Sequence, residues 1–207
     1  GCDQHSRWFL RSLVTSVALK QRAPFLALKT HGLVLDESRQ KMSKTRSDMV
    51  IDPEDLLLGT LKADGARSHG YGPDVLRLWV ANHDTDKDIA VTQESLTEAN
   101  QQVKMFRQVA KQLLGNLFEF DPNEQRLDFS ELNKIDRMMK IMVIEFLTSQ
   151  RKIMDQSLDV REYTQAVRTF MAEYVVNFYL ELVKDRLMFG QGTQQFLSTH
   201  HTLSLEV

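Results

Sequence analysis

The sequence is poor in cysteine and lacks a long hydrophobic run, and both absences limit what the protein does. Cys2 is the single cysteine among 207 residues, which excludes an internal disulfide and a cysteine-built zinc site and fits a reducing compartment. No uninterrupted apolar stretch approaches the length of a membrane span, so we expect no membrane partner. The chain opens at Gly1 without a methionine or a signal pattern, and we expect it to start inside a longer one.

An excess of charge of one sign is also missing. The 26 Lys and Arg residues nearly balance the 28 Asp and Glu residues, so no overall field favours nucleic acid or an anionic membrane. Any RNA contact must therefore come from a local patch. Hydrophobic residues make up 42% of the chain, which is enough to build the core of one large or two small soluble domains.

Up to about residue 90, short apolar stretches alternate with polar loops, which is typical of α/β proteins. Asp52-Pro53 and Gly72-Pro73 have the residues that begin helices. Residues 60–70 are polar and predict a surface insertion. The other expected features are a helix over residues 4–20, a strand and turn over residues 31–35, and an apolar side on the Pro73 helix made of Val75, Leu76, Trp79 and Val80.

From about residue 92 the pattern is helical only. A first long helix has a stripe at spacings of three and four, a second is rich in methionine, and a third starts at the capping pattern Asp159-x-x-Glu162. We predict three antiparallel helices joined by short loops, followed by a weakly patterned tail. The expected buried positions are Leu96, Ala99, Val103, Phe106, Ala110, Leu113 and Leu117; then Ile135, Met138, Met139, Met142, Phe146 and Ile153; then Tyr163, Val167, Phe170, Tyr174 and Phe178.

The sharpest local motif is Lys41-Met42-Ser43-Lys44, in a charged loop after the expected strand. Two ammonium groups three residues apart reach the same polyphosphate, and they stabilise the charge that grows on pyrophosphate as it leaves. The alternative interpretation is a solvated basic turn. Its four residues alone do not separate the two.

The order and spacing of further segments add to this motif. Together they resemble class I isoleucyl-tRNA synthetases over about residues 1–189, with mitochondrial or bacterial-type wording. The segments are Gly1-Cys2-Asp3-Gln4-His5, Trp8-Phe9, Ala23-Pro24-Phe25, His31-Gly32, Leu35-Asp36-Glu37, Lys41 to Lys44, Ile51-Asp52-Pro53, Tyr71 to Ala81, Asn177-Phe178-Tyr179 and Lys184-Asp185-Arg186-Leu187.

The resemblance implies a fold class and three segments. Residues 1–90 would be the C-terminal part of the catalytic domain, an α/β, Rossmann-like nucleotide-binding core with its lysine loop. Residues 91–189 would be the first part of an all-α, helical anticodon-binding domain. Residues 190–207 would be a truncated tail.

The resemblance also implies roles for particular residues. Lys41 and Lys44 would be catalytic and, with Met42 and Ser43, would hold the ATP phosphates. Other residues would line the substrate sites. These are His31 and Gly32 beside the ATP adenosine, and Asp3, Gln4 and Trp8 around the aminoacyl-adenylate. Taken without the resemblance, Trp8 and His31 are equally well explained as core residues, and Asp3 and Gln4 as helix caps.

The implied activity is that of an isoleucine–tRNA ligase, which activates isoleucine with ATP and Mg²⁺ and transfers it to tRNA(Ile). We expect no bound zinc or other metal held by the chain, a monomeric full-length enzyme, and the mitochondrial matrix, with the cytoplasm as the alternative. Lys104, Arg107 and Lys111 share one helix face and are candidates for contacting the tRNA backbone, although an ordinary solvated face explains them as well.

Two departures from the family's wording separate this chain from its relatives. Ser6-Arg7 stands where the family has Arg-Gly, and Thr45 to Asp48 replace Ser-Leu-Gly-Asn. The His-x-Gly-His signature, which binds ATP from the other half of the core, is absent from the printed sequence. We therefore expect the 207-residue chain alone to be inactive. The alternative function is a noncatalytic, tRNA-binding or regulatory remnant.

Overall fold

A computed structural model describes residues 1–42, 51–60, 69–117, 121, 127–156, 160–190, 198–199 and 202. The chain forms two compact units, Gly1–Asn100 and Gln101–Val207, and each is described by itself. Within the described ranges, no helix is both long and apolar enough to span a membrane. The assignment of residues 1–90, 91–189 and 190–207 to synthetase segments stays a prediction.

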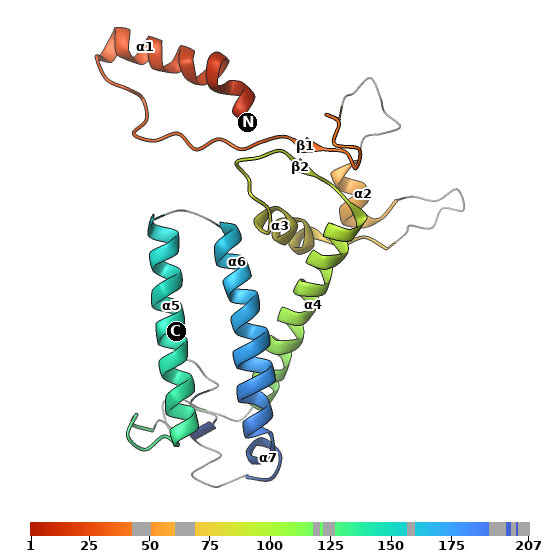
Figure 1. The fold of residues 1–207 in the computed structure, drawn as a ribbon, viewed down its shortest axis with the longest axis vertical. Coiled ribbons are helices and arrows are strands. Elements are labelled where there is room, and N and C mark those ends of the chain that lie inside the picture. Colours follow the sequence, from red (N-terminus) through yellow and green to blue (C-terminus); the bar gives the residue numbers. More distant parts are fainter. Residues whose placement is uncertain are drawn as a thin grey trace. The chain divides into compact units, whose positions relative to one another are not determined.

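The first unit begins with a continuous helical segment, as the sequence predicts. It comprises a 3-10 turn (η1, Cys2–Gln4), a π-helix (η2, His5–Phe9) and an α-helix (α1, Leu10–Lys20), drawn in red in Figure 1. The helix ends at Gln21, whose φ of 53° is left-handed, and its amide donates to Val17 O at 2.9 Å. None of α1's residues is buried, so its apolar side chains face outward as far as the chain is described.

Two short strands pair in parallel in the first unit. Val34–Leu35 (β1) aligns with Ile89–Ala90 (β2), and Val34 lies opposite Ile89. Parallel strands need a long crossover, and the connection between them contains two helices, α2 (Pro53–Leu58) and α3 (Pro73–Ala81). The predicted strand is therefore present, but it is shorter than residues 31–35.

Both predicted helix starts are confirmed. Asp52 caps α2 by accepting from the Glu54 amide at 2.8 Å, and Pro53 occupies the first helical position. Gly72 precedes α3 with a φ of 81°, a conformation that favours glycine. The predicted insertion at residues 60–70 lies largely outside the described residues.

The core of the first unit is formed around Trp79. Its ring is 4% exposed, and its indole Nε1 donates to Ser95 Oγ at 2.9 Å in the first turn of α4 (Gln93–Asn116). Ser95 and Thr92 cap that turn reciprocally, since the Ser95 amide donates to Thr92 Oγ1 at 3.2 Å. Val75, Leu96 and Ala99 are buried as predicted, whereas Val80 is exposed and its prediction as a core residue is wrong.

The second unit is a packed set of helices. It contains the later part of α4, then α5 (Lys134–Gln156), α6 (Val160–Thr169), a π-helix (η4, Phe170–Leu180) and α7 (Glu181–Phe189). Figure 1 shows α5 beside α6 and running in the opposite direction. The predicted helices are present, but residues 117–133 separate α4 from α5, so the predicted short loop is wrong there. The buried cluster consists of Val109, Met139, Phe170, Val175, Tyr179, Leu180 and Val183.

The π-helix changes which residues the third predicted helix buries. Phe170, Val175 and Leu180 are buried at spacings of five, as expected where hydrogen bonds run from residue i to i+5. Tyr163 and Tyr174, predicted from an α-helical period, are more than a third exposed. The prediction of both tyrosines as buried is wrong because the helix does not keep one period.

Two further core predictions are wrong. Ala110 is exposed and its neighbour Val109 is buried, because different partners cover the beginning and the later part of α4. In α5, Met138 is 41% exposed whereas Asp136 is completely buried. A carboxylate at a buried position of an amphipathic helix is the largest surprise of this unit.

Candidate functional site

The N-terminal turn lies against the loop that contains His31. The Cys2 amide donates to His31 O at 2.8 Å, and His5 Nε2 shares a hydrogen bond with Thr30 Oγ1 at 3.0 Å. Both links join residues about 25 to 30 positions apart in the sequence. The structure therefore brings Asp3, predicted at the adenylate, into the neighbourhood of His31, predicted at the adenosine.

Gly32 occupies a position where no side chain fits. Its amide donates to Thr85 O at 2.9 Å, and a Cβ added to it would lie 2.2 Å from Lys87 O. The neighbouring His31 ring is exposed, and its Nδ1 bonds the Gly32 carbonyl at 2.9 Å. His31 is thus not a core histidine, and the glycine allows residues 84–88 to pack directly on this loop.

Asp88 is a residue of this region that the sequence analysis missed. Its Oδ1 accepts from the Leu33 amide at 2.7 Å, just ahead of β1. It therefore fixes the loop that precedes the strand. An acidic residue directly before a short apolar strand is too common a pattern to have singled it out.

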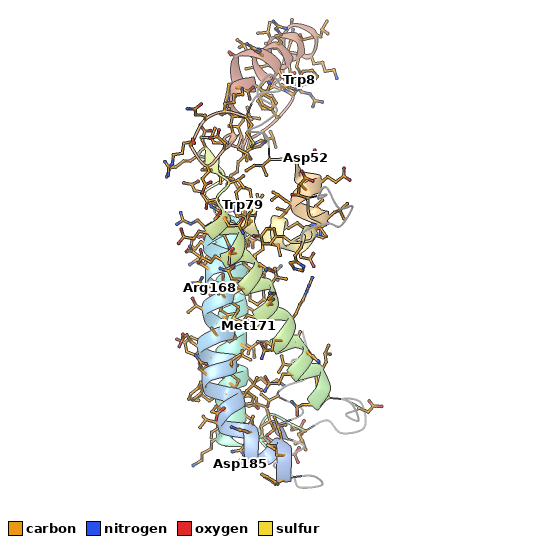
Figure 2. All side chains as sticks on the ribbon, turned by 90° about the vertical axis from the view of Figure 1, so that its right-hand side faces the viewer. Trp8, Asp52, Trp79, Arg168, Met171 and Asp185 are labelled. Atoms are coloured by element: carbon orange, nitrogen blue, oxygen red, sulfur yellow. The ribbon has the colours of Figure 1, made fainter. Side chains whose placement is uncertain are left out.

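Gln4 and Trp8 line a groove of about 620 Å³ along α1, which we call the α1 groove. Arg7, Arg11 and Lys20 also line it, and Pro24 does so from the returning chain. The Trp8 side chain is 68% exposed, and Figure 2 shows it at the N-terminal helix. The interpretation of Trp8 as a core residue is therefore wrong, and its ring is available to a ligand.

The chain folds back at the groove through short links. Ser16 Oγ donates to Arg22 O at 2.8 Å, and the rings of Phe9 and Phe25 meet edge to face at 6.4 Å. Ser12 Oγ donates to Trp8 O at 2.9 Å, so this hydroxyl hydrogen is already in use. The cap interpretation of Asp3 and Gln4 is not supported, since neither side chain caps its helix; Gln4 Nε2 donates to Asp3 Oδ2 at 3.2 Å instead.

A tight turn places Lys41 at the carboxyl end of β1. The amide of Gln40 donates to Asp36 Oδ1 at 2.7 Å, and Arg39 takes a left-handed φ of 58°. The chain thereby returns, and Lys41 forms an antiparallel bridge with Leu35. Met42 follows directly, whereas Ser43 and Lys44 lie outside the described residues.

The predicted tRNA face on α4 is exposed. Lys104, Arg107 and Lys111 all lie on the solvent side, while Val109 of the same helix is buried. This placement fits an RNA contact and an ordinary solvated face equally well. Their role stays a prediction.

The second unit contains a buried polar group that we call the Asp136 cluster, made of Asp136, Tyr179, Arg186 and Ser198. Tyr179 Oη donates to Asp136 Oδ1 at 2.9 Å, and Ser198 Oγ donates to Oδ2 at 2.5 Å. Arg186 Nη1 lies 3.5 Å from the same Oδ2. Burial, reinforced by the Asp136 charge, raises the pKa of Tyr179 well above its usual range. The sequence analysis missed this cluster because its members are far apart in the chain.

Comparisons with known proteins bear on both units. Residues 1–92 match the family described as class I tRNA synthetases (I, L, M and V). The isoleucine–tRNA ligase of Crocosphaera subtropica is 37% identical over 187 residues, covering 90% of this chain and 19% of the relative. That of Prochlorococcus marinus is 37% identical over 189 residues, with the same two coverages.

The chain spans about a fifth of the length of the curated relatives it matches, as the 19% coverage shows. The third interpretation, in which the lysine motif is a coincidence in an unrelated domain, is wrong because the similarity extends over both units. The chain therefore belongs to the class I tRNA synthetases, and its relatives within that family are isoleucine–tRNA ligases.

Proposed function

We propose that this chain supplies part of the adenylate site of an isoleucine–tRNA ligase. Isoleucine and ATP give isoleucyl-adenylate and pyrophosphate, and the acyl group then passes to the terminal ribose of tRNA(Ile). The observation that carries the proposal is the 37% identity over 187 residues to proteins named isoleucine–tRNA ligase. The alternative, a noncatalytic tRNA-binding or regulatory remnant, is kept as an outcome of the test below.

Three regions of the first unit would contribute to substrate binding. In this proposal Asp3 and Gln4 hold the polar end of the amino acid, and Trp8 forms an apolar wall for its side chain. An apolar wall distinguishes small hydrophobic side chains mainly by shape. The hydrogen bond from the Cys2 amide to His31 O supports the proposal, because it holds the amino-acid residues beside the predicted adenosine site.

His31 and Gly32 would border the adenosine, with the backbone of Gly32 exposed to close approach. Lys41 to Lys44 would hold the phosphates and stabilise the charge that develops on pyrophosphate. Lys41 follows the carboxyl end of β1, the end of a parallel strand at which nucleotides bind in open α/β sheets. This position supports the finer assignment of residues 1–90 to a Rossmann-like core.

Mg²⁺ would reach this site with ATP, bound by the phosphates, as is usual for a cation that keeps several of its waters. Across the described ranges, no three His, Cys, Asp or Glu side chains gather as a metal site. The chain's own contribution would therefore be the ammonium groups of Lys41 and Lys44. These neutralise phosphate charge without coordinating the metal.

The later helices would position the tRNA. Lys104, Arg107 and Lys111 would contact phosphates, which orients an RNA without reading its bases. Their exposure on α4 supports this role. In the same proposal, residues 91–189 form the first part of the anticodon-binding bundle, the full-length enzyme is a monomer, and its compartment is the mitochondrial matrix, which subcellular fractionation of the source cells would test.

A chimaera provides the decisive test. The matching segment of the Crocosphaera subtropica enzyme is replaced by this chain, and isoleucine-dependent exchange of labelled pyrophosphate into ATP is measured. We expect exchange, and a loss of at least about 100-fold with Lys44→Ala, since such a loss is typical for a group that stabilises transition-state charge. Arg77→Gln, at an exposed ion pair with Asp74, is the matched control and should leave exchange unchanged.

Exchange with valine or leucine in preference to isoleucine would overturn the assignment of substrate. A folded chimaera without exchange, combined with tRNA(Ile) binding by the 207-residue chain, would favour the noncatalytic alternative.

A further inference from the structure

The α1 groove is lined by cations alone among its charged residues. Arg7, Arg11 and Lys20 line it, and no aspartate or glutamate does. In the part of the chain that the structure describes, none of the three has an ion-pair partner. Like charges that share one surface repel one another, so an anion bound in the groove is favoured.

The spacing of these cations indicates the shape of that anion. A helix rises about 1.5 Å per residue, so Arg7 and Arg11 lie about 6 Å apart along the axis and Lys20 about 14 Å further on. A single pyrophosphate is too short to contact all three. A chain of successive phosphates along the helix is long enough.

Trp8 adds a second, uncharged contact in the same groove. Its ring is 68% exposed, and it lies between Arg7 and Arg11 in the sequence. Exposed aromatic rings flanked by basic residues are the stacking surfaces on which proteins hold unpaired bases. An acidic peptide would satisfy the arginines but would place nothing flat on the indole.

The hydroxyl groups of the groove support the same division of roles. Ser12 and Ser16 donate their hydrogens to the backbone carbonyls of Trp8 and Arg22, at 2.9 and 2.8 Å. They therefore present oxygen lone pairs rather than donors to the groove. The hydrogen bonds to phosphate oxygens must come from the guanidinium and ammonium groups.

We propose that the α1 groove binds single-stranded RNA, with Arg7 and Arg11 on successive phosphates, Trp8 stacked on a base, and Lys20 extending the track. The proposal deepens the proposed function and rests on it for the identity of the natural RNA, whose terminal ribose must reach the adenylate beside Gln4. Arg7 stands where the relatives' wording has glycine, so this cation is a property of the present chain. The binding itself does not require catalysis.

The test uses the full 207-residue chain and a fluorescein-labelled, single-stranded RNA of 12 nucleotides, followed by anisotropy between 50 and 200 mM KCl. We expect the double variant Arg7→Gln/Arg11→Gln to bind about 10-fold more weakly and to reduce the slope of log K against log salt by about 1.4, from about 0.7 per contact with a single strand. The matched control, Arg77→Gln/Lys87→Gln, removes two cations that have carboxylate partners in the same unit. It should change neither quantity.

A second measurement isolates the stacking contact. Trp8→Ala should weaken binding by about 10-fold, Trp8→Phe should retain most of it, and a duplex of the same strand should bind less well. RNA should also quench the part of the emission that is lost in Trp8→Phe. Circular dichroism verifies that these exposed substitutions leave the helices intact.

Equal affinity and equal salt slope for the arginine double variant and its control would overturn the proposal. Competition by polyglutamate as effective as that by unlabelled RNA would do so too, because it would reduce the groove to a nonspecific anion surface. The failure of the adenylate proposal is read separately, from the chimaera's pyrophosphate exchange.

Discussion

The helices of the second unit direct their apolar side chains at one another, whereas α1 in the first unit directs its own outward. Phe170 stacks on Phe146 at 4.2 Å, and Val183 is completely buried. In α1, by contrast, Leu10, Val14 and Leu19 are each half exposed or more. Similar apolar spacing thus gives a core in one region and an uncovered face in the other.

This difference teaches that the two regions are stabilised by different interactions. The second unit gains free energy from buried apolar area and from the hydrogen bonds of the Asp136 cluster. The N-terminal region depends on backbone links such as that from Cys2 to His31. Sparse packing is typical of the segments that bind ligands, because those segments must open locally.

The largest expected effect comes from removing the buried carboxylate. Asp136→Ala leaves Tyr179, Ser198 and Arg186 without their shared acceptor, and we expect a loss of about 3–5 kcal/mol in the free energy of unfolding. Urea unfolding followed by circular dichroism measures it. Asp136→Asn, which retains an acceptor oxygen, should lose less, and equal losses for both variants would contradict the role assigned to the charge.

A smaller loss is expected where the first unit is tightly packed. Gly32→Ala puts a Cβ 2.2 Å from Lys87 O, so the backbone must shift, at a cost of about 1–3 kcal/mol. Both tryptophans, Trp8 and Trp79, belong to this unit, so its unfolding is followed by their emission. Gly115→Ala meets no neighbouring atom within 4 Å and is the control. A cost-free Gly32→Ala would show that the contact with residues 84–88 is loose.

Alkaline pH should destabilise the second unit. Tyr179 keeps its proton in the folded state to a higher pH than in the unfolded state, because its pKa is raised. Below about pH 10 both states are protonated and the stability contribution is constant. Above it the unfolded state loses the proton, and stability should fall by up to about 1.4 kcal/mol per pH unit. Hydrogen exchange of α5 between pH 9 and 11 measures this slope, which Tyr179→Phe should reduce.

The hydrogen bond between α3 and α4 should be worth less. Trp79→Phe loses the bond to Ser95 Oγ and part of the buried ring, and we expect about 1–2 kcal/mol. Thermal unfolding followed by circular dichroism gives the value. Ser95→Ala removes the acceptor and should have a similar effect, whereas additive losses in the double variant would contradict the pairing.

The smallest effect should occur on the uncovered face of α1. Val14 is 60% exposed, so Val14→Ser should change stability by less than about 0.5 kcal/mol. The same substitution at Val183, which is completely buried, should cost several times more. Urea midpoints of the two variants compare the regions directly. A substantial loss at Val14 would mean that this face is covered in the folded protein.

Local signals in the sequence were sufficient for the helix starts and for the family. Asp52-Pro53 begins α2 as predicted because a cap requires only residues adjacent in the chain. Which face of a helix is buried depends on partners that the sequence does not specify, and this explains the errors at Val80, Ala110 and Met138. The roles predicted for Asp3, Trp8, His31 and Lys44 remain predictions, although the fold places the first three in one unit.

The Asp136 cluster was unpredictable for a related reason. Its carboxylate meets Tyr179 and Arg186 across separations of 43 and 50 residues, and Asp136 by itself has the ordinary appearance of an acid in the first turn of a helix. Only the packed helices show that the three side chains share one site. Long-range polar pairs therefore mark the limit of what periodicity reveals.

The π-helical segment Phe170–Leu180 acts as an insertion that the protein has absorbed. Deleting one residue there would restore an ordinary α-helix and rotate everything after it by about 100°. Val183 would leave the core, and Arg186 would turn away from Asp136. The length of this stretch is thus as constrained as its composition, and single-residue gaps among relatives should avoid it.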